Sequence, residues 1–206
     1  MKDKELTKQK LIRAVGEVVK KEGFQNLKIS KIAKYAQVDR KLIYRYFGSL
    51  DYLVEAYILE NDYWMVFSDK MKEMLAGKHF SGSEQLITEV LQNQFSYFAS
   101  QKETQRLILW ELSVNSPLMR SIHNVRENLG QEFLDLSDAH FQGGTVNFRA
   151  VAALLVGGIY YTILHTVYNG GTFAGIDLNT KSGKDEISKA LAQIVHWAYQ
   201  GASTII

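Results

Sequence analysis

Residues 29–49 of the 206-residue chain read ISKIAKYAQVDRKLIYRYFGS, and this stretch decides the fold. Apolar residues recur at helical spacing over about 29–36, which predicts a short helix that breaks at Gln37. Asp39 is a good N-cap for a second helix over about 40–47. Two short helices joined by a sharp turn predict a helix-turn-helix.

A longer helix precedes this pair. Apolar residues from Leu11 to Val19 form one stripe at helical spacing, and basic residues followed by Gly23 mark its end. With one proline in the chain and no alternating runs typical of strands, the whole protein is predicted to be all-α. We expect a three-helix N-terminal domain over residues 1–48.

The outward side of the third helix carries cations and phenols: Arg40, Lys41, Tyr44 and Arg45, with Tyr46 nearby. Such side chains reach phosphates and guanine edges in DNA. Residues 1–50 hold 13 Lys/Arg against 5 Asp/Glu, a net charge of +8, whereas residues 51–206 hold 11 against 17, a net charge of −6. This split predicts a phosphate-binding module on an acidic body. The alternative is that Tyr44, Tyr46 and Phe47 are core aromatics. We favour this alternative for Phe47.

Over about residues 7–60 the sequence resembles the tetracycline-repressor (TetR) family of bacterial regulators. The matching residues are Ile32-Ala33, Ala36, Val38, the run from Leu42 to Ser49, and Leu53. In that family the third helix enters the major groove, and the resemblance implies the following DNA-binding residues: Lys28, Arg40, Lys41, Leu42, Tyr44, Arg45 and Tyr46.

Four positions depart from the family pattern. Gln37 stands where glycine is usual, so it is expected to adopt a left-handed conformation. Lys28 replaces a capping threonine and cannot cap, although it can still meet a phosphate, and Leu50 replaces a lysine that contacts the DNA backbone. Asp39 replaces serine or threonine, and its charge would face phosphate unless the cap holds it.

Residues 49–206 are predicted to form a helical ligand-binding and dimerisation domain. The expected helices cover 49–76, 81–101, 103–115, 117–141, 146–169 and 184–203. The first of them continues from the DNA-binding domain, so it is a natural lever between the two parts. The glycine-rich loop 170–183 is either a lid or a plain connector.

Two of these helices predict a dimer. The helix 146–169 is apolar nearly all round, and the apolar stripe of 184–203 is wider than one core contact requires, so a four-helix bundle with a second copy is expected. The expected interface residues are Leu154, Gly157, Gly158, Ile187, Leu191, Ile194 and Trp197. Alternatively, the two glycines only relieve crowding inside one chain.

The resemblance implies a small molecule that binds among the middle helices and re-angles the fourth helix. The sequence offers these candidate ligand-binding residues: Trp64, Phe95, Trp110, His123 and Tyr161. An apolar pocket with few hydrogen-bonding groups is typical of such sites. Core packing is the alternative for each residue taken alone.

Other classes of protein are disfavoured. The chain has no cysteine, its histidines lack metal-site spacing, and no phosphate-binding loop or nucleophile elbow occurs. We therefore expect no enzyme, no cofactor and no metal. The charged N-terminus is unlike a signal peptide, and the strongly apolar run from Ala150 to Leu164 is shorter than the roughly 20 residues that span a membrane, so we expect a cytoplasmic protein.

The sequence thus predicts a homodimeric transcriptional regulator that binds a pseudo-palindromic operator and acts as a repressor released by a small-molecule effector. The alternative is a constitutive or architectural DNA-binding protein with a protein partner in place of the effector.

Overall fold

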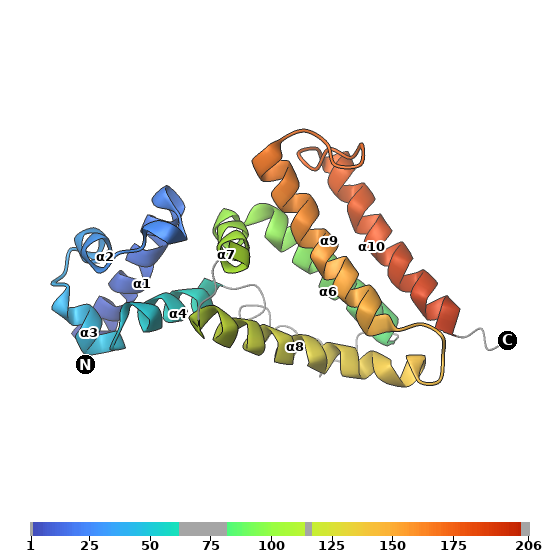
Figure 1. Ribbon diagram of the computed structural model, residues 1–206, viewed down its shortest axis with the longest axis horizontal. Coiled ribbons are helices and arrows are strands. Elements are labelled where there is room, and N and C mark those ends of the chain that lie inside the picture. Colours follow the sequence, from blue (N-terminus) through green and yellow to red (C-terminus); the bar gives the residue numbers. More distant parts are fainter. Residues whose placement is uncertain (1, 62–81, 114–116, 203–206) are drawn as a thin grey trace. The chain divides into compact units, whose positions relative to one another are not determined.

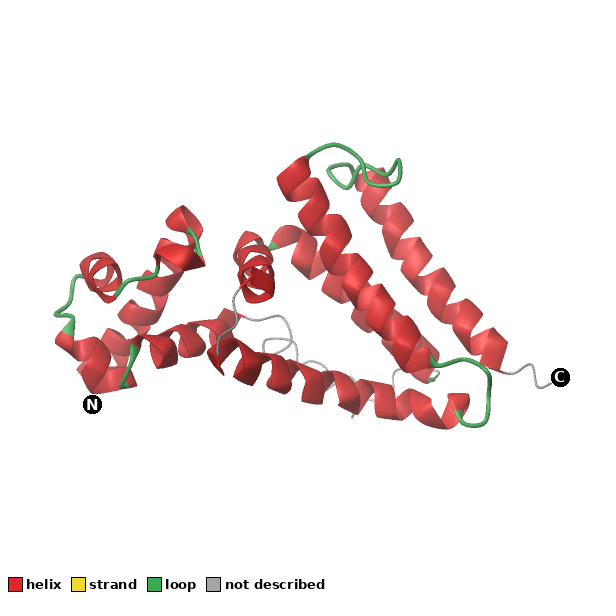
Figure 2. Ribbon diagram, viewed as in Figure 1, coloured by secondary structure: helices red, strands yellow, loops and turns green. Residues whose placement is uncertain are grey.

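The computed structural model describes residues 2–61, 82–113 and 117–202, which form helices joined by turns (Figures 1 and 2). These ranges contain no strand, only one isolated bridge between Phe173 and Ile176. The all-α prediction is confirmed. In chain order the elements are α1 (Lys2–Glu22), the 3-10 turn η1 (Phe24–Asn26), α2 (Ile29–Ala36), α3 (Lys41–Phe47), α4 (Leu50–Asn61), α6 (Ser83–Ser100), α7 (Lys102–Ser113), α8 (Pro117–Phe141), α9 (Phe148–Asn169) and α10 (Lys181–Ala202).

The helices fall into two compact units. The first contains α1 to α4, α7 and the part of α8 that ends at Arg126. The second contains α6, the part of α8 from Glu127 onward, α9 and α10. The first unit therefore extends beyond the helix-turn-helix and includes a helix from later in the chain. The predicted division of roles at residues 48 and 49 stays a prediction.

The first unit is built around α1. The stripe predicted from Leu11 to Val19 is fully buried and packs with Ile32, Ile43 and Leu53 from α2, α3 and α4. Where α1 meets α4, a Cβ on Gly16 would lie 3.0 Å from a ring carbon of Tyr57, so only glycine fits there without a shift. This close packing fixes α1 as the support for the helix-turn-helix.

The second unit contains α6, α9 and α10, which lie side by side (Figure 1). Phe95, Ile159 and Val195 lie in its core, one from each helix. The side-chain amide of Gln92 on α6 donates a hydrogen bond of 3.0 Å to the carbonyl oxygen of Ser188 on α10. These contacts pack the three helices into one bundle.

Helix α9 is long and apolar enough to cross a membrane by length and composition alone. It has 22 residues, more than the apolar run considered from the sequence. Asn147 caps it by accepting a hydrogen bond of 3.2 Å from the backbone N–H of Ala150. One side of α9 packs on α6, and only 28% of its most apolar window is buried.

The loop between α9 and α10 has a defined structure. Phe173 and Ile176 exchange two backbone hydrogen bonds, of 3.0 and 2.9 Å, and Leu178 is buried. The hydroxyl of Thr180 accepts a hydrogen bond of 3.0 Å from the N–H of Gly183. This cap explains why α10 begins three residues before the start that the sequence predicted.

Candidate nucleic-acid interface and effector region

The turn between α2 and α3 has the predicted backbone. Gln37 has φ 55° and ψ 44°, so the left-handed conformation is confirmed at the position where glycine is usual. The N–H groups of Gln37 and Val38 donate hydrogen bonds to the carbonyl oxygens of Lys34 and Ala33, which closes the end of α2. A non-glycine residue held in this region stores strain of order 1 kcal/mol.

Helix α3 begins at Lys41, one residue later than predicted, and Arg40 occupies the N-cap position without a side-chain cap, so Asp39 acts from the residue before it. A carboxylate oxygen of Asp39 accepts a hydrogen bond of 2.7 Å from the backbone N–H of Lys41. The cap holds this negative charge at the positive end of the helix, where it is favourable. Asp39 thus orients the helix that carries the candidate DNA contacts.

The outward side of α3 is exposed and cationic. Arg40, Lys41 and Arg45 are exposed, and 55% of Tyr44 is accessible, whereas Ile43 is fully buried on the opposite side. No acidic side chain of the described residues forms an ion pair with these three cations within 4.0 Å. Unpaired cations around a phenol on a short rigid helix suit contact with a phosphate backbone.

The other predicted DNA contacts lie at the edge of this surface. Leu42 and Tyr46 are half-buried. The Tyr46 ring has the guanidinium of Arg45 and the ammonium of Lys4 each 5.9 Å from its centroid. Lys28 is exposed at the start of α2 and makes no side-chain cap there, as expected of a lysine.

Comparison with known proteins identifies this N-terminal region. Residues 11–57 match the sequence model described as "Bacterial regulatory proteins, tetR family". Over residues 11–57 the chain has the DNA-binding domain of the TetR family. This domain makes the chain a DNA-binding transcriptional regulator, as the sequence predicted. A search among curated proteins finds no match.

Solved structures of bacterial regulators share the fold over most of this chain. FadR from Bacillus subtilis, in complex with stearoyl-CoA, aligns with a TM-score of 0.69 and 21% identity over 91% of this chain and 96% of its own. FadR from Bacillus halodurans aligns with a TM-score of 0.66 and 20% identity, over 91% of this chain and 96% of its own. FadR from Thermus thermophilus, in complex with lauroyl-CoA, aligns with a TM-score of 0.59 and 15% identity, over 97% of this chain and 96% of its own. At these identities the likeness establishes the fold.

The four predicted effector residues that the structure describes are divided between the two units. Trp64 lies outside the described residues. Phe95 is buried on α6 in the second unit, whereas Tyr161 on α9 is 58% exposed and packs against Phe173 at 5.3 Å between ring centroids. In the first unit, His123 is exposed on α8 and Trp110 stacks on Phe24 with centroids 4.9 Å apart. These five assignments stay predictions.

The predicted dimer residues show an apolar surface. On α9, Leu154 is 78% exposed, and a Cβ on Gly157 or Gly158 would meet no atom of the described residues within 4 Å beyond its own helix backbone. Within the described part of the chain, these glycines therefore relieve no crowding. On α10, Trp197 is 63% exposed; Ile194 is exposed too, Ile187 is half-buried and Leu191 is buried.

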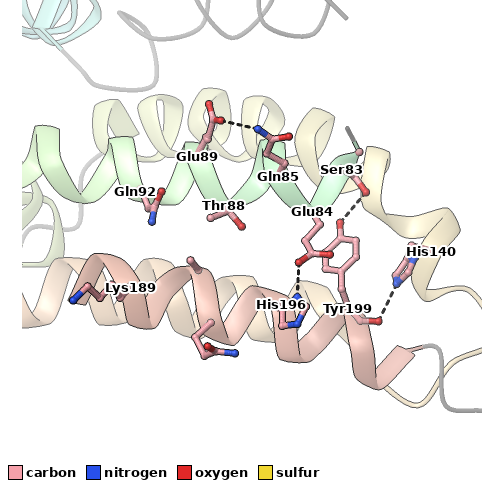
Figure 3. A pocket seen from close by; sticks show the side chains of 13 residues that line it. Ser83, Glu84, Gln85, Thr88, Glu89, Gln92, His140, Lys189, His196 and Tyr199 are labelled. Carbon is pink, nitrogen blue, oxygen red and sulfur yellow. Dashed lines mark hydrogen bonds and ion pairs between the residues drawn. The ribbon is translucent and has the colours of Figure 1, made fainter. Parts of the chain in front are cut away.

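A cleft with a volume of about 1100 Å³ lies between α6 and α10 (Figure 3). A carboxylate oxygen of Glu84 lies 2.9 Å from Nδ1 of His196 across it, and the Tyr199 hydroxyl donates a hydrogen bond of 2.9 Å to Ser83. Burial raises the pKa of the Tyr199 phenol, and its hydrogen bond with Ser83 opposes this. His140 contacts the carbonyl oxygen of Tyr199 at the end of the cleft. Most of the residues that line this cleft have polar or charged side chains, unlike those of an apolar effector pocket.

An ion-pair cluster fixes the corner before α9. Arg149 donates hydrogen bonds of 2.7 Å to Asp135 and 2.6 Å to Asp138. The hydrogen bond from Arg149 holds the pKa of Asp138 below its usual range. All three side chains are substantially exposed, so the cluster orients the corner without adding much stability.

Two groups of functional interest were not found from the sequence. Arg106 on α7 donates hydrogen bonds to the last carbonyl groups of α1, with Lys20 and Glu103 paired beside it at 3.3 Å. Gln94 on α6 is buried, and its amide donates a hydrogen bond to the hydroxyl of Tyr160. The first contact joins residues far apart in sequence, and no local pattern indicates it. The second did have a signal, because a glutamine stands in an apolar stripe.

Proposed function

We propose that this regulator is a cytoplasmic homodimeric repressor, and that a small-molecule effector releases it from a pseudo-palindromic operator. The observation that carries the DNA-binding role is the exposed cationic side of α3, supported on a helix whose Asp39 cap and buried Ile43 fix its orientation. The DNA contacts would be those predicted from the sequence, with Tyr44 and Arg45 central.

The dimer would form through α9 and α10. Large apolar side chains exposed on the two helices include Leu154, Tyr161 and Trp197, and glycines on α9 leave room for close approach of a second backbone. Apolar surface of this kind is buried in stable homodimers. A two-fold axis would place the two α3 helices one DNA turn apart, about 34–36 Å.

Long-chain acyl-CoA esters are the first effector class to test. Two of the structurally similar regulators are in complex with stearoyl-CoA and lauroyl-CoA. The described interior between α6 and α9 is strongly apolar, which suits an acyl chain. The effector would act by binding better to the conformation whose α3 helices do not match successive major grooves.

The test is binding of the purified protein to a labelled duplex from the region upstream of its own gene, titrated with salt and competitor DNA. Saturable binding by a dimer that competitor leaves largely intact, with affinity falling steeply in log salt, is expected of an operator-specific regulator. Stearoyl-CoA should then lower the affinity, whereas free CoA should not. Binding that competitor abolishes would indicate an architectural protein. Operator binding that no acyl-CoA alters would contradict the effector class.

A further inference from the structure

Gln94 occupies a position that packing alone would give to an apolar residue. It falls within the buried stripe of α6 between Leu91 and Phe98, and only 1% of its surface is exposed. Glutamine at a buried helix position loses hydration, so both ends of its amide need hydrogen-bond partners.

Only one end of this amide has a partner. Nε2 of Gln94 donates a hydrogen bond of 3.0 Å to the hydroxyl oxygen of Tyr160 on α9, while Oε1 is buried and accepts none. The Tyr160 ring is held edge-on by Phe98, with centroids 4.8 Å apart. A half-turn of the amide exchanges its two ends, and the phenol can accept or donate. In the observed orientation the pair can offer a ligand an acceptor, and in the exchanged orientation it can offer an N–H.

The helix segments that meet at this pair carry no full charge. Residues 90–101 and 150–169 contain no Asp, Glu, Lys or Arg. A carboxylate buried between them would lack a counter-charge, which is strongly unfavourable. The ligand group that suits this place is neutral, polar and attached to an apolar body.

We infer that the Gln94–Tyr160 pair is the polar contact for the neutral carbonyl of an otherwise apolar effector, an acyl ester or thioester. The inference rests on the proposed function, because it assigns the contact within the effector site of a ligand-released repressor. In the orientation with Tyr160 donating to Oε1, the Gln94 N–H donates to the ligand carbonyl. The ligand thereby satisfies the amide end that has no partner in its absence.

The test compares two CoA compounds and three proteins. The compounds are stearoyl-CoA and its thioether analogue S-octadecyl-CoA, which lacks the thioester carbonyl. The proteins are the parent, Gln94→Leu and the control Gln92→Leu. Gln92 lies on the same helix, but its amide donates to the carbonyl oxygen of Ser188. Binding is measured by titration calorimetry and stability by thermal unfolding without ligand.

The parent should bind the thioester about three- to tenfold more tightly than the thioether, the range expected for one hydrogen bond. Gln94→Leu should lose this preference and should raise Tm, because it removes a buried amide with one unsatisfied end. Gln92→Leu should keep the preference and lower Tm. The two variants should therefore change Tm in opposite directions, which distinguishes a ligand contact from a structural role.

An unchanged preference in Gln94→Leu, together with a lower Tm, overturns the inference and leaves the proposed function standing. If the parent binds neither compound, both the inference and the proposed effector class are wrong. Operator release by stearoyl-CoA in the parent reports on the proposed function separately.

Discussion

The guanidinium of Arg106 on α7 donates a hydrogen bond of 2.7 Å to the carbonyl oxygen of Val19, in the last turn of α1. It also bonds the carbonyl oxygen of Lys20. The last carbonyl groups of a helix have no partner within the helix and carry its negative dipole, so a cation there is doubly favourable. Arg106 therefore joins a helix from the middle of the chain to the helix that supports the DNA-binding turn.

Replacing Arg106 by alanine should lower the free energy of unfolding by about 1–3 kcal/mol, because charge-assisted hydrogen bonds to part-buried carbonyls are lost. Urea unfolding followed by circular dichroism measures this. Lys102→Ala is the matched control: Lys102 is exposed in the first turn of the same helix, where a cation is not favoured. Equal effects of the two changes would show that the Arg106 contact contributes nothing specific.

Gln37→Gly should raise stability by up to about 1 kcal/mol, because glycine adopts φ 55° without the strain that glutamine bears. Greater freedom of glycine in the unfolded chain offsets part of this gain. Gln37→Ala is the control and should not stabilise, since alanine keeps the strain. A lower Tm for Gln37→Gly than for Gln37→Ala would contradict the argument.

The helix-turn-helix could be predicted because its signals are local. The stripe of α1, the break at Gln37 and the cap at Asp39 each lie within a few residues of their partners, and the structure has all three. Short-range sterics and capping fix such features before any tertiary packing.

The contact between Arg106 and α1 and the surroundings of the candidate effector residues could not be predicted in the same way. Periodicity identifies which side of a helix is apolar, but not which distant group a polar side chain meets. Arg106 and Val19 are 87 residues apart in sequence. Trp110 was a candidate ligand residue, and the structure stacks it on Phe24. Gln94 could have been singled out from the sequence, because it is a polar residue within the apolar stripe of α6.

Gly183→Ala should destabilise the start of α10. A Cβ at this position would lie 2.0 Å from the carbonyl oxygen of Asp177, a backbone atom that cannot move without disturbing the loop. The expected loss is about 1–3 kcal/mol, as for other overpacked sites. Thermal unfolding tests this, with Gly82→Ala as a control because no atom of the described residues lies within 4 Å of its Cβ position. Equal Tm values for the two variants would be evidence against the steric argument.

Leu154→Glu should convert a dimer to a monomer without unfolding the protomer. Leu154 is 78% exposed, so the substitution costs little within one chain but would bury a charge in the proposed interface. Sedimentation velocity measures the change in mass. Leu112→Glu on α7 is the control, because Leu112 is 77% exposed but lies outside α9 and α10. A dimer that persists in Leu154→Glu and dissociates in Leu112→Glu would place the interface elsewhere.

Tyr44→Phe and Arg45→Ala should both weaken operator binding while leaving the dimer and Tm unchanged, since both side chains are exposed on α3. If Arg45 neutralises one phosphate, its loss should also reduce the slope of log affinity against log salt by about 0.9. Tyr44→Phe removes a hydroxyl but no charge, so its slope should stay that of the parent.

Fluorescence anisotropy at several salt concentrations gives both quantities. Lys184→Ala is the charge-matched control, because it removes one exposed cation from α10 and leaves α3 intact. It should bind the operator as the parent does. Parent-like affinity and slope for both α3 variants would mean that another surface of the chain meets the DNA. If α3 binds the DNA, loss of its exposed cation or phenol must change the affinity or the salt slope.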